Sequence, residues 1–277
     1  MKKTKVLFVS QEIAPYLPET PLSKTARELP QAMQEKGREI RTFMPRFGNI
    51  NERRNQLHEV IRLSGMNLII DDNDQPLIIK VASIQAARMQ VYFIDNEEFF
   101  QRKCTTTDAD GKFFEDNDER MLFFCKGVLE TVKKLGWAPD VIHCQGWMTA
   151  LLPLLIKTTY KDEPLFNEAK VIYSLHNDEF AEPMSHRLAE KLILEGVDKS
   201  YIEDLKNPDY NQITKHALKL SDGVVVHSEN INPEFISFAA DNNKLVLPFS
   251  NPDSFHDDCS NFYDTVLLGE SVDEMVA

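Results

Sequence analysis

The alternation of short apolar runs with helical patterns constrains the fold of this chain more than any other feature. Residues 6–9 form a continuous apolar run, as expected for a strand that is covered on both faces. Apolar residues from Leu22 to Met33 then recur at intervals of three and four, which predicts a helix over 22–36. A second apolar run follows at 39–44. This strand–helix–strand order favours a parallel sheet.

The same alternation continues to about residue 240 and predicts an α/β fold with a doubly wound, mostly parallel, Rossmann-like sheet. Pro30 lies within the first helical segment and predicts a kink or a restarted helix there. Later strands are expected at 139–143, 171–175 and 223–226, and later helices at 117–135, 147–157, 210–220 and 233–240.

Three segments depart from this pattern. Residues 57–95 hold several β-like stretches and predict a β-rich insertion in a domain that spans 1–249. Residues 101–115 are polar and predict a loop. Residues 250–277 are acidic and rich in Asn, Asp and Ser, which predicts a mobile tail.

The formal net charge of −13 disfavours nucleic acid and anionic membranes as partners, because an acidic surface repels phosphate groups. The four cysteines lack metal-ligand or redox-motif spacing, so we expect reduced thiols and a cytoplasmic location. The apolar run at 6–9 is too short for a signal peptide, and no stretch reaches transmembrane length.

Glycine-rich phosphate-binding motifs are missing from the sequence. There is no Gly-x-Gly-x-x-Gly, no P-loop and no Gly-x-Ser-x-Gly. A Rossmann-type fold usually places a glycine loop after its first strand, and this chain does not have one. We therefore expect no bound nucleotide cofactor. We also expect no metal, because the cysteines lack ligand spacing and the acidic segments at 71–74 and 108–111 read as a solvated turn and a failed EF-hand pattern.

The most informative stretch runs from Asp116 to Ala150. It opens with Asp116-Asn117-Asp118-Glu119-Arg120, continues with Trp137-Ala138-Pro139-Asp140-Val141-Ile142-His143, and ends with Cys144-Gln145-Gly146-Trp147-Met148-Thr149-Ala150. This order and spacing resemble the N-terminal half of the bacterial glycogen and plant starch synthases, the GT5 family of ADP-glucose-dependent glycosyltransferases with a GT-B fold. In that family Asp-Asn-x-x-Arg opens a helix, and Trp-x-Pro-Asp-Val-Val-His leads into Ala-His-Asp-Trp.

Shorter landmarks agree with this resemblance, which extends over roughly residues 3–240. They are Glu12-Ile13-Ala14-Pro15, Glu28-Leu29-Pro30-Gln31-Ala32, Met44-Pro45-Arg46-Phe47-Gly48, Leu175-His176-Asn177 and Ser221-Asp222-Gly223-Val224-Val225-Val226-His227-Ser228. The resemblance implies one half of a GT-B enzyme and, as activity, glucosyl transfer from ADP-glucose to an α-1,4-glucan.

Candidate sugar-binding residues lie at or directly after the predicted strand ends, where open α/β sheets bind their ligands. His143 and His176 match family positions, and each is either a sugar contact or a structural histidine. Trp147 is either a sugar-stacking platform or a core anchor. The candidates are Gln11, His143, Gln145, Trp147, His176 and Asn177.

Two departures from the family pattern bear on catalysis. The family's Lys-Thr-Gly-Gly-Leu loop, which binds the nucleotide-sugar phosphates, corresponds to Pro18-Glu19-Thr20-Pro21-Leu22 here. Proline offers no N–H group and Glu19 adds like charge, so this loop is expected to repel a pyrophosphate. Gln145 and Gly146 replace the family's His-Asp pair, and glutamine cannot exchange a proton near neutral pH.

Two hypotheses follow, and the sequence leaves both open. The first is an enzyme that needs a partner, because the chain ends where the second GT-B domain would begin; the partner is a separate second half or a further copy of the chain. The second is a non-catalytic glucan-binding or regulatory module, inactive towards ADP-glucose. An unrelated flavodoxin-like binding domain is a third, weaker interpretation.

Overall fold

The computed structural model describes residues 3–269 of the 277-residue chain. Its strands are β1 (Lys5–Ser10), β2 (Glu39–Pro45), β3 (His58–Glu59), β4 (Met66–Ile70), β5 (Asn73–Ile84), β6 (Met89–Asp95), β7 (Val141–Gln145), β8 (Lys170–Leu175), β9 (Gly223–Val226) and β10 (Leu245–Leu247). Its α-helices are α1 (Pro21–Glu35), α2 (Glu52–Asn55), α3 (Glu97–Phe100), α4 (Asn117–Leu135), α5 (Leu152–Lys157), α6 (Leu188–Leu194), α7 (Tyr210–Leu220), α8 (Pro233–Asp241) and α9 (Phe255–Leu268).

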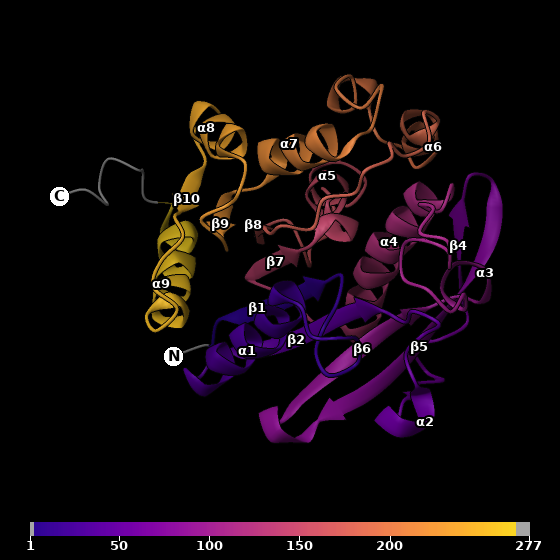
Figure 1. Cartoon of the computed structure of the whole chain (residues 1–277), viewed down its shortest axis with the longest axis horizontal. Helices are drawn as coiled ribbons and strands as arrows, with labels where there is room; N and C mark the ends of the chain where they lie inside the picture. The colour runs from indigo at the N-terminus through magenta and orange to yellow at the C-terminus, as the bar shows by residue number, and fades with distance from the viewer. Residues whose placement is uncertain (1–2, 270–277) are drawn as a thin grey trace.

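A single sheet organises these elements (Figure 1). Its strand order is β10-β9-β8-β7-β1-β2-β6-β5-β3, with β4 paired to β5. The strands from β10 to β6 in this order are parallel, and β5, β3 and β4 pair in antiparallel fashion. The prediction of a mostly parallel, doubly wound α/β sheet is therefore confirmed. The chain winds outward in both directions from the β1–β7 pair.

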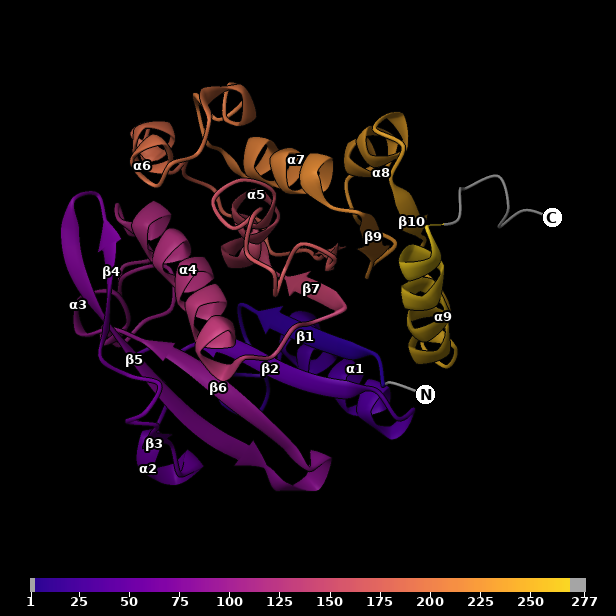
Figure 2. The ribbon, with the colours of Figure 1, turned by 180° about the vertical axis from the view of Figure 1, so that it is seen from behind.

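Apolar clusters fill both faces of this sheet. On one face, Val6 and Phe8 of β1 pack with side chains from α1 and α9. On the other face, Leu7 and Val9 belong to a larger cluster that includes residues of α4, α5 and α7. Figure 2 shows these two sets of helices from behind. None of the helices among residues 3–269 has the length and apolar character needed to cross a membrane.

Helix α1 continues past Pro30 and does not restart as predicted. It begins with a capping box, in which the side chains of Thr20 and Ser23 accept from each other's backbone N–H groups. Pro30 is buried with the apolar face of the helix. The capping box and the burial of the apolar face stabilise the helix, and this offsets the loss of the backbone hydrogen bond that Pro30 cannot donate.

The β-rich segment over 57–95 forms an antiparallel extension of the parallel sheet. Strand β5 pairs with β6 over seven residues, and β4 folds back on β5. Strand β6 itself runs parallel to β2 and so belongs to the main sheet. Residues 61–63, within the segment predicted to be β-rich, form a turn instead.

The segment from residue 250 differs from the expected mobile tail. It contains helix α9, and Cys259, Phe262, Tyr263 and Val266 on that helix are buried in the cluster with Val6 and Phe8. Their spacing of three and four places them on one face, while Asp257 and Asp258 are not part of this buried set. Residues 270–277, also assigned to the tail, lie outside the described residues.

We predict that Phe262→Ala destabilises the folded chain by about 3–5 kcal/mol, because it removes a large side chain that is 1% exposed. Leu268→Ala, on the same helix but 71% exposed, is the matched control and should change stability by less than about 0.5 kcal/mol. Urea denaturation followed by circular dichroism measures both. Equal, small effects would show that α9 is not part of the folded core.

Candidate active site

The two strands at the centre of the sheet define the position of the site. Strands β1 and β7 are neighbours, but the chain leaves them in opposite directions along the sheet. Beyond their carboxyl ends, the Gln11 N–H donates to the Gln145 carbonyl at 2.9 Å. Such a switch point leaves a crevice between the departing loops. A cleft of about 540 Å³ opens there.

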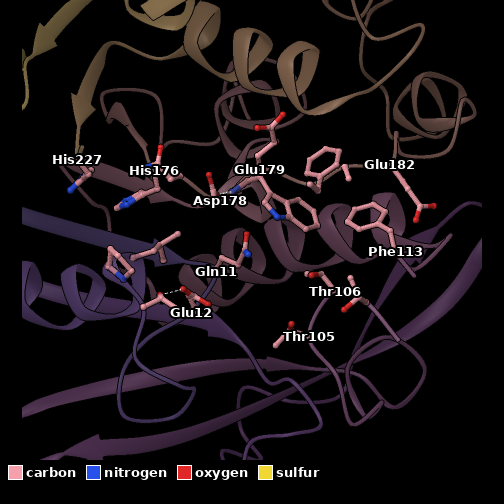
Figure 3. A pocket seen from close by; sticks show the side chains of 18 of the residues that line it. Gln11, Glu12, Thr105, Thr106, Phe113, His176, Asp178, Glu179, Glu182 and His227 are labelled. Carbon is pink, nitrogen blue, oxygen red and sulfur yellow. Dashed lines mark hydrogen bonds between the residues drawn. The ribbon is translucent and has the colours of Figure 1, made fainter. Parts of the chain in front are cut away.

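Loops after several strands contribute to the walls of this cleft (Figure 3). One wall comes from the β1–α1 connection and another from the segments after β8 and β9. A third wall is the long loop before α4. The lining residues are Gln11, Glu12, Thr20, Pro21, Leu22, Thr105, Thr106, Thr107, Gly111, Phe113, Trp147, His176, Asn177, Asp178, Glu179, Phe180, Ala181, Glu182, His227 and Ser228.

Three aromatic rings pack against one another along the cleft, where Phe113 and Phe180 are each 8% exposed. Phe113 and Phe180 stack at 5.1 Å between ring centroids, with an angle of 15° between their planes. The Trp147 ring contacts Phe180 edge-on at 5.0 Å and lies 5.7 Å from Phe113. Because Trp147 is only 2% exposed, it mainly supports the two phenylalanines.

Carboxylates dominate the charge of the cleft. Glu12, Asp178, Glu179 and Glu182 line it, and none of the lining residues in the described part of the chain is a lysine or arginine. Burial raises the pKa of Glu12, whose carboxylate accepts from the Thr20 hydroxyl. The cleft is therefore suited to a neutral or cationic ligand and opposes an anionic one.

The N-terminus of α1 reaches this cleft, yet its hydrogen-bonding groups are largely committed. Pro21, the first helical residue, has no N–H group. The Ser23 N–H donates to the Thr20 hydroxyl at 3.0 Å, and the Lys24 N–H donates to the Thr20 carbonyl. Little of the anion-binding capacity typical of a helix N-terminus is left for a phosphate.

Asp178 lies shortly after the end of strand β8 and joins several elements. Its carboxylate accepts from the Trp147 backbone N–H at 2.7 Å and from the Tyr210 hydroxyl at 2.8 Å. Burial raises the pKa of Asp178 to about 6, although these hydrogen bonds lower it in part. Its protonation state consequently changes just below neutral pH.

The structure brings four of the six candidate residues to the cleft and places two beneath it. Gln11, Trp147, His176 and Asn177 line the cleft. His143 and Gln145 are fully buried and do not line it. The Gln145 side chain accepts from the Ser10 hydroxyl at 2.7 Å, while its Nε2 has no partner among the described residues.

His143 belongs to a buried polar network. Its Nδ1 lies 2.5 Å from the Tyr263 hydroxyl of α9, and its Nε2 lies 2.5 Å from the Ser174 hydroxyl. The same hydroxyl is 2.8 Å from Nε2 of His227, which stacks on His176 at 4.0 Å. Burial lowers the pKa of His143 and of His176 to about 3, so both imidazoles are neutral at physiological pH.

Arg120 holds the cleft loop in place. Its guanidinium is fully buried and donates to the Phe99 carbonyl at 2.7 Å, to Asn117 Oδ1 at 2.6 Å and to the Thr105 carbonyl at 2.6 Å. Asn117 in turn donates to the Thr106 carbonyl at 2.8 Å. The Asp-Asn-x-x-Arg motif thus acts as a clamp on the residues that form one wall.

Sequence reasoning missed several residues of the cleft, for different reasons. Asp178 and the pair His227-Ser228 follow strands β8 and β9 closely, so the rule of strand carboxyl ends could have found them. Thr105–Thr107 and Phe113 lie in the polar segment predicted as a loop. No sequence signal there indicates that Arg120 and Asn117 hold it against the sheet.

Comparison with known proteins agrees with this geometry. Residues 5–245 match the family described as the starch synthase catalytic domain. The chain belongs to the starch synthase catalytic-domain family. Its similarity to that family therefore extends from β1 into β10 and includes all the residues that line the cleft.

Relatives of this starch synthase-family chain are longer. The glycogen synthase of Chlorobium limicola is 38% identical over 197 residues, which cover 71% of this chain and 40% of the relative. The glycogen synthase of Pelodictyon phaeoclathratiforme is 35% identical over 231 residues, or 82% and 47% of the two chains. The chain thus spans less than half the length of these relatives.

A solved structure shares the fold. The catalytic domain of starch synthase IV from Arabidopsis thaliana, bound to ADP and acarbose, superposes with a TM-score of 0.73 at 21% identity. The match covers 92% of this chain and 53% of the other. The resemblance of the fold to one half of a GT-B enzyme is thereby confirmed.

We predict that Asp178→Asn changes how stability depends on pH. An aspartate whose pKa rises to about 6 on folding makes the native state less stable as the pH rises from about 4 to 6. Asparagine has no such titration and retains an acceptor for the Trp147 N–H. The free energy of unfolding of the variant, relative to that of the parent, should therefore rise by about 1 kcal/mol between pH 5 and 7.

Urea denaturation across this pH range measures the difference. Asp253→Asn, at an exposed position, is the matched control and should show no such trend. A pH-independent loss of stability in Asp178→Asn would contradict the prediction, because the carboxylate would then act only as a hydrogen-bond acceptor.

Proposed function

We propose that this chain binds an α-1,4-glucan in the cleft and that these residues alone do not transfer glucose from ADP-glucose. The lining of the cleft carries the proposal, since it combines aromatic rings and carboxylates without a lysine or arginine among its described residues. Membership of the family supports a glucan as ligand, because the curated relatives are named glycogen synthases.

The cleft lining matches the chemistry of a neutral sugar. A pyranose ring offers an apolar face, which packs on aromatic side chains such as Phe113 and Phe180. Its hydroxyls donate to carboxylates, and Glu179 and Glu182 present such acceptors in the cleft. The amides of Gln11 and Asn177 both donate and accept. A chain of neutral glucose units could therefore pack on aromatic rings and form hydrogen bonds in this cleft.

In the part of the chain that the structure describes, the cleft lacks the cations that a nucleoside diphosphate would need. Transfer from ADP-glucose requires stabilisation of the leaving diphosphate, and losing one such electrostatic contact commonly lowers the rate about a hundredfold or more. Here the corresponding loop has no lysine and lies beside Glu12, and the Ser23 and Lys24 N–H groups at the start of the helix are committed to Thr20. Buried His143 is neutral and Gln145 is an amide, so neither side chain can act as a general acid at neutral pH.

A second candidate function is an enzyme that depends on a partner. The observation that favours it is length: the match covers 40–47% of the glycogen synthases, so most of their sequence has no counterpart in these 277 residues. Residues outside these 277, or another copy of this chain, would have to supply the donor-binding wall and its cations. The cleft described above would then hold the acceptor glucan.

We predict that calorimetric titration with maltooligosaccharides shows saturable binding, whereas ADP and ADP-glucose show none at the same concentrations. Phe180→Ala should weaken glucan binding by about tenfold, because the sugar loses an aromatic surface. Phe249→Ala is the matched control, since Phe249 is 38% exposed and does not line the cleft. Tight binding of ADP-glucose together with no glucan binding would overturn the proposal.

We also predict that the purified chain releases no ADP from ADP-glucose and glycogen above background. The assay is run with and without extract of the source cells. Release only with extract would favour the partner-dependent enzyme, and none in either would favour the non-catalytic module. Turnover by the purified chain at about one per second, ordinary for an enzyme, would contradict the proposed lack of transfer.

A further inference from the structure

A second groove lies at the opposite edge of the sheet, where the parallel strands begin. It is formed by the amino ends of β2 and β6, the end of α1 and residues just before β1, and it encloses about 380 Å³. Four cations line it: Lys3, Arg38, Arg41 and Arg88. Among the described residues, Glu39 supplies the only carboxylate of the lining. The positive lining contrasts with the net charge of −13 of the whole chain.

Arg41 is the central residue of this groove. Its guanidinium lies over the rings of Trp137 and Tyr92, at 5.2 and 5.8 Å from their centroids. Its Nη1 donates to the Tyr92 hydroxyl at 2.8 Å, whereas its Nε–H is buried without a partner among the described residues. The two rings hold the planar group in a fixed orientation, and part of its hydrogen-bonding capacity is unused.

Nearby carboxylates neutralise these cations only in part, because Asp264 forms an ion pair with Arg38. Arg38 is bonded to Asp264 and Ser260 of α9. Within residues 3–269, no ion pair involves Lys3, Arg41 or Arg88. The Glu39 carboxylate accepts from the Trp137 indole N–H at 2.5 Å. The groove therefore retains an excess of positive charge.

We propose that this groove binds the phosphate group of a small phosphate monoester. The charged guanidinium of Arg41, held over its two rings, faces this groove, and exposed Lys3 and Arg88 add positive charge to the same lining. Tyr92 and Gln90 line the same groove and suit the hydroxyls of the esterified group. The net charge of −13 disfavours long polyanions such as nucleic acid, so the proposed ligand is a small molecule.

This site is independent of the proposed glucan-binding function. The groove lies at the amino edge of the sheet, whereas the cleft lies at the carboxyl edge, and the two share no lining residue. A phosphate monoester in the groove and a glucan in the cleft would not compete sterically. Failure of one proposal consequently leaves the other untouched.

Titration of the full chain with inorganic phosphate and with glycerol 3-phosphate tests the proposal, and glycerol serves as the uncharged probe. Both phosphates should bind saturably and glycerol should not. Arg41→Gln should weaken phosphate binding about tenfold, because a charge-assisted hydrogen-bonding pair is lost. Arg53→Gln on α2, exposed and outside the groove, is the matched control and should leave binding unchanged.

Because Arg41 also packs on two rings, its replacement can affect folding. The double variant Lys3→Gln with Arg88→Asn avoids this problem: both positions are exposed, and asparagine tolerates the left-handed backbone at residue 88, where φ is 49°. It should also weaken phosphate binding. The proposal is overturned if neither phosphate binds up to about 20 mM, well above a millimolar dissociation constant. It is likewise overturned if the double variant and Arg53→Gln behave alike.

Discussion

The parallel pairing of β1 with β7 is the constraint on which the rest of the structure depends. Five residues of each strand are in register, and the chain continues from this pair towards β2 on one side and β8 on the other. The divergence opens the cleft, and the bond from Gln11 N–H to the Gln145 carbonyl extends the pairing beyond the strands to its base. Every wall of the cleft is a connection that leaves this central sheet.

The sequence predicted the central sheet well because its strands are buried on both faces and read as unbroken apolar runs. The sequence-based prediction was wrong at α9, because it relied on the polar composition of that segment. Cys259, Phe262, Tyr263 and Val266 have clear helical spacing, yet the surrounding Asp, Asn and Ser residues dominate the composition of that segment. Periodicity was the informative signal there, and average polarity was misleading.

The site was only partly predictable. A residue's position at the end of a strand does not determine whether its side chain lines the cleft or is buried beneath it. His143 and Gln145 alternate with Cys144 along β7 and point into networks below the cleft, while Gln11, one residue beyond β1, reaches it. Thr105–Thr107 and Phe113 approach from a polar loop whose location depends on three-dimensional bonds to Arg120 and Asn117. Local patterns contain no information about such a tether.

The buried Arg120 has a consequence for how sequences of this kind are interpreted. Its three hydrogen bonds support the architecture of a wall and involve no reacting atom. A chain that lost all transferase chemistry would still need this residue to keep its loop ordered, since an orphaned guanidinium in the interior is costly. A genome search that scores the Asp-Asn-x-x-Arg signature therefore detects the scaffold of this wall, whatever chemistry the chain that carries it performs.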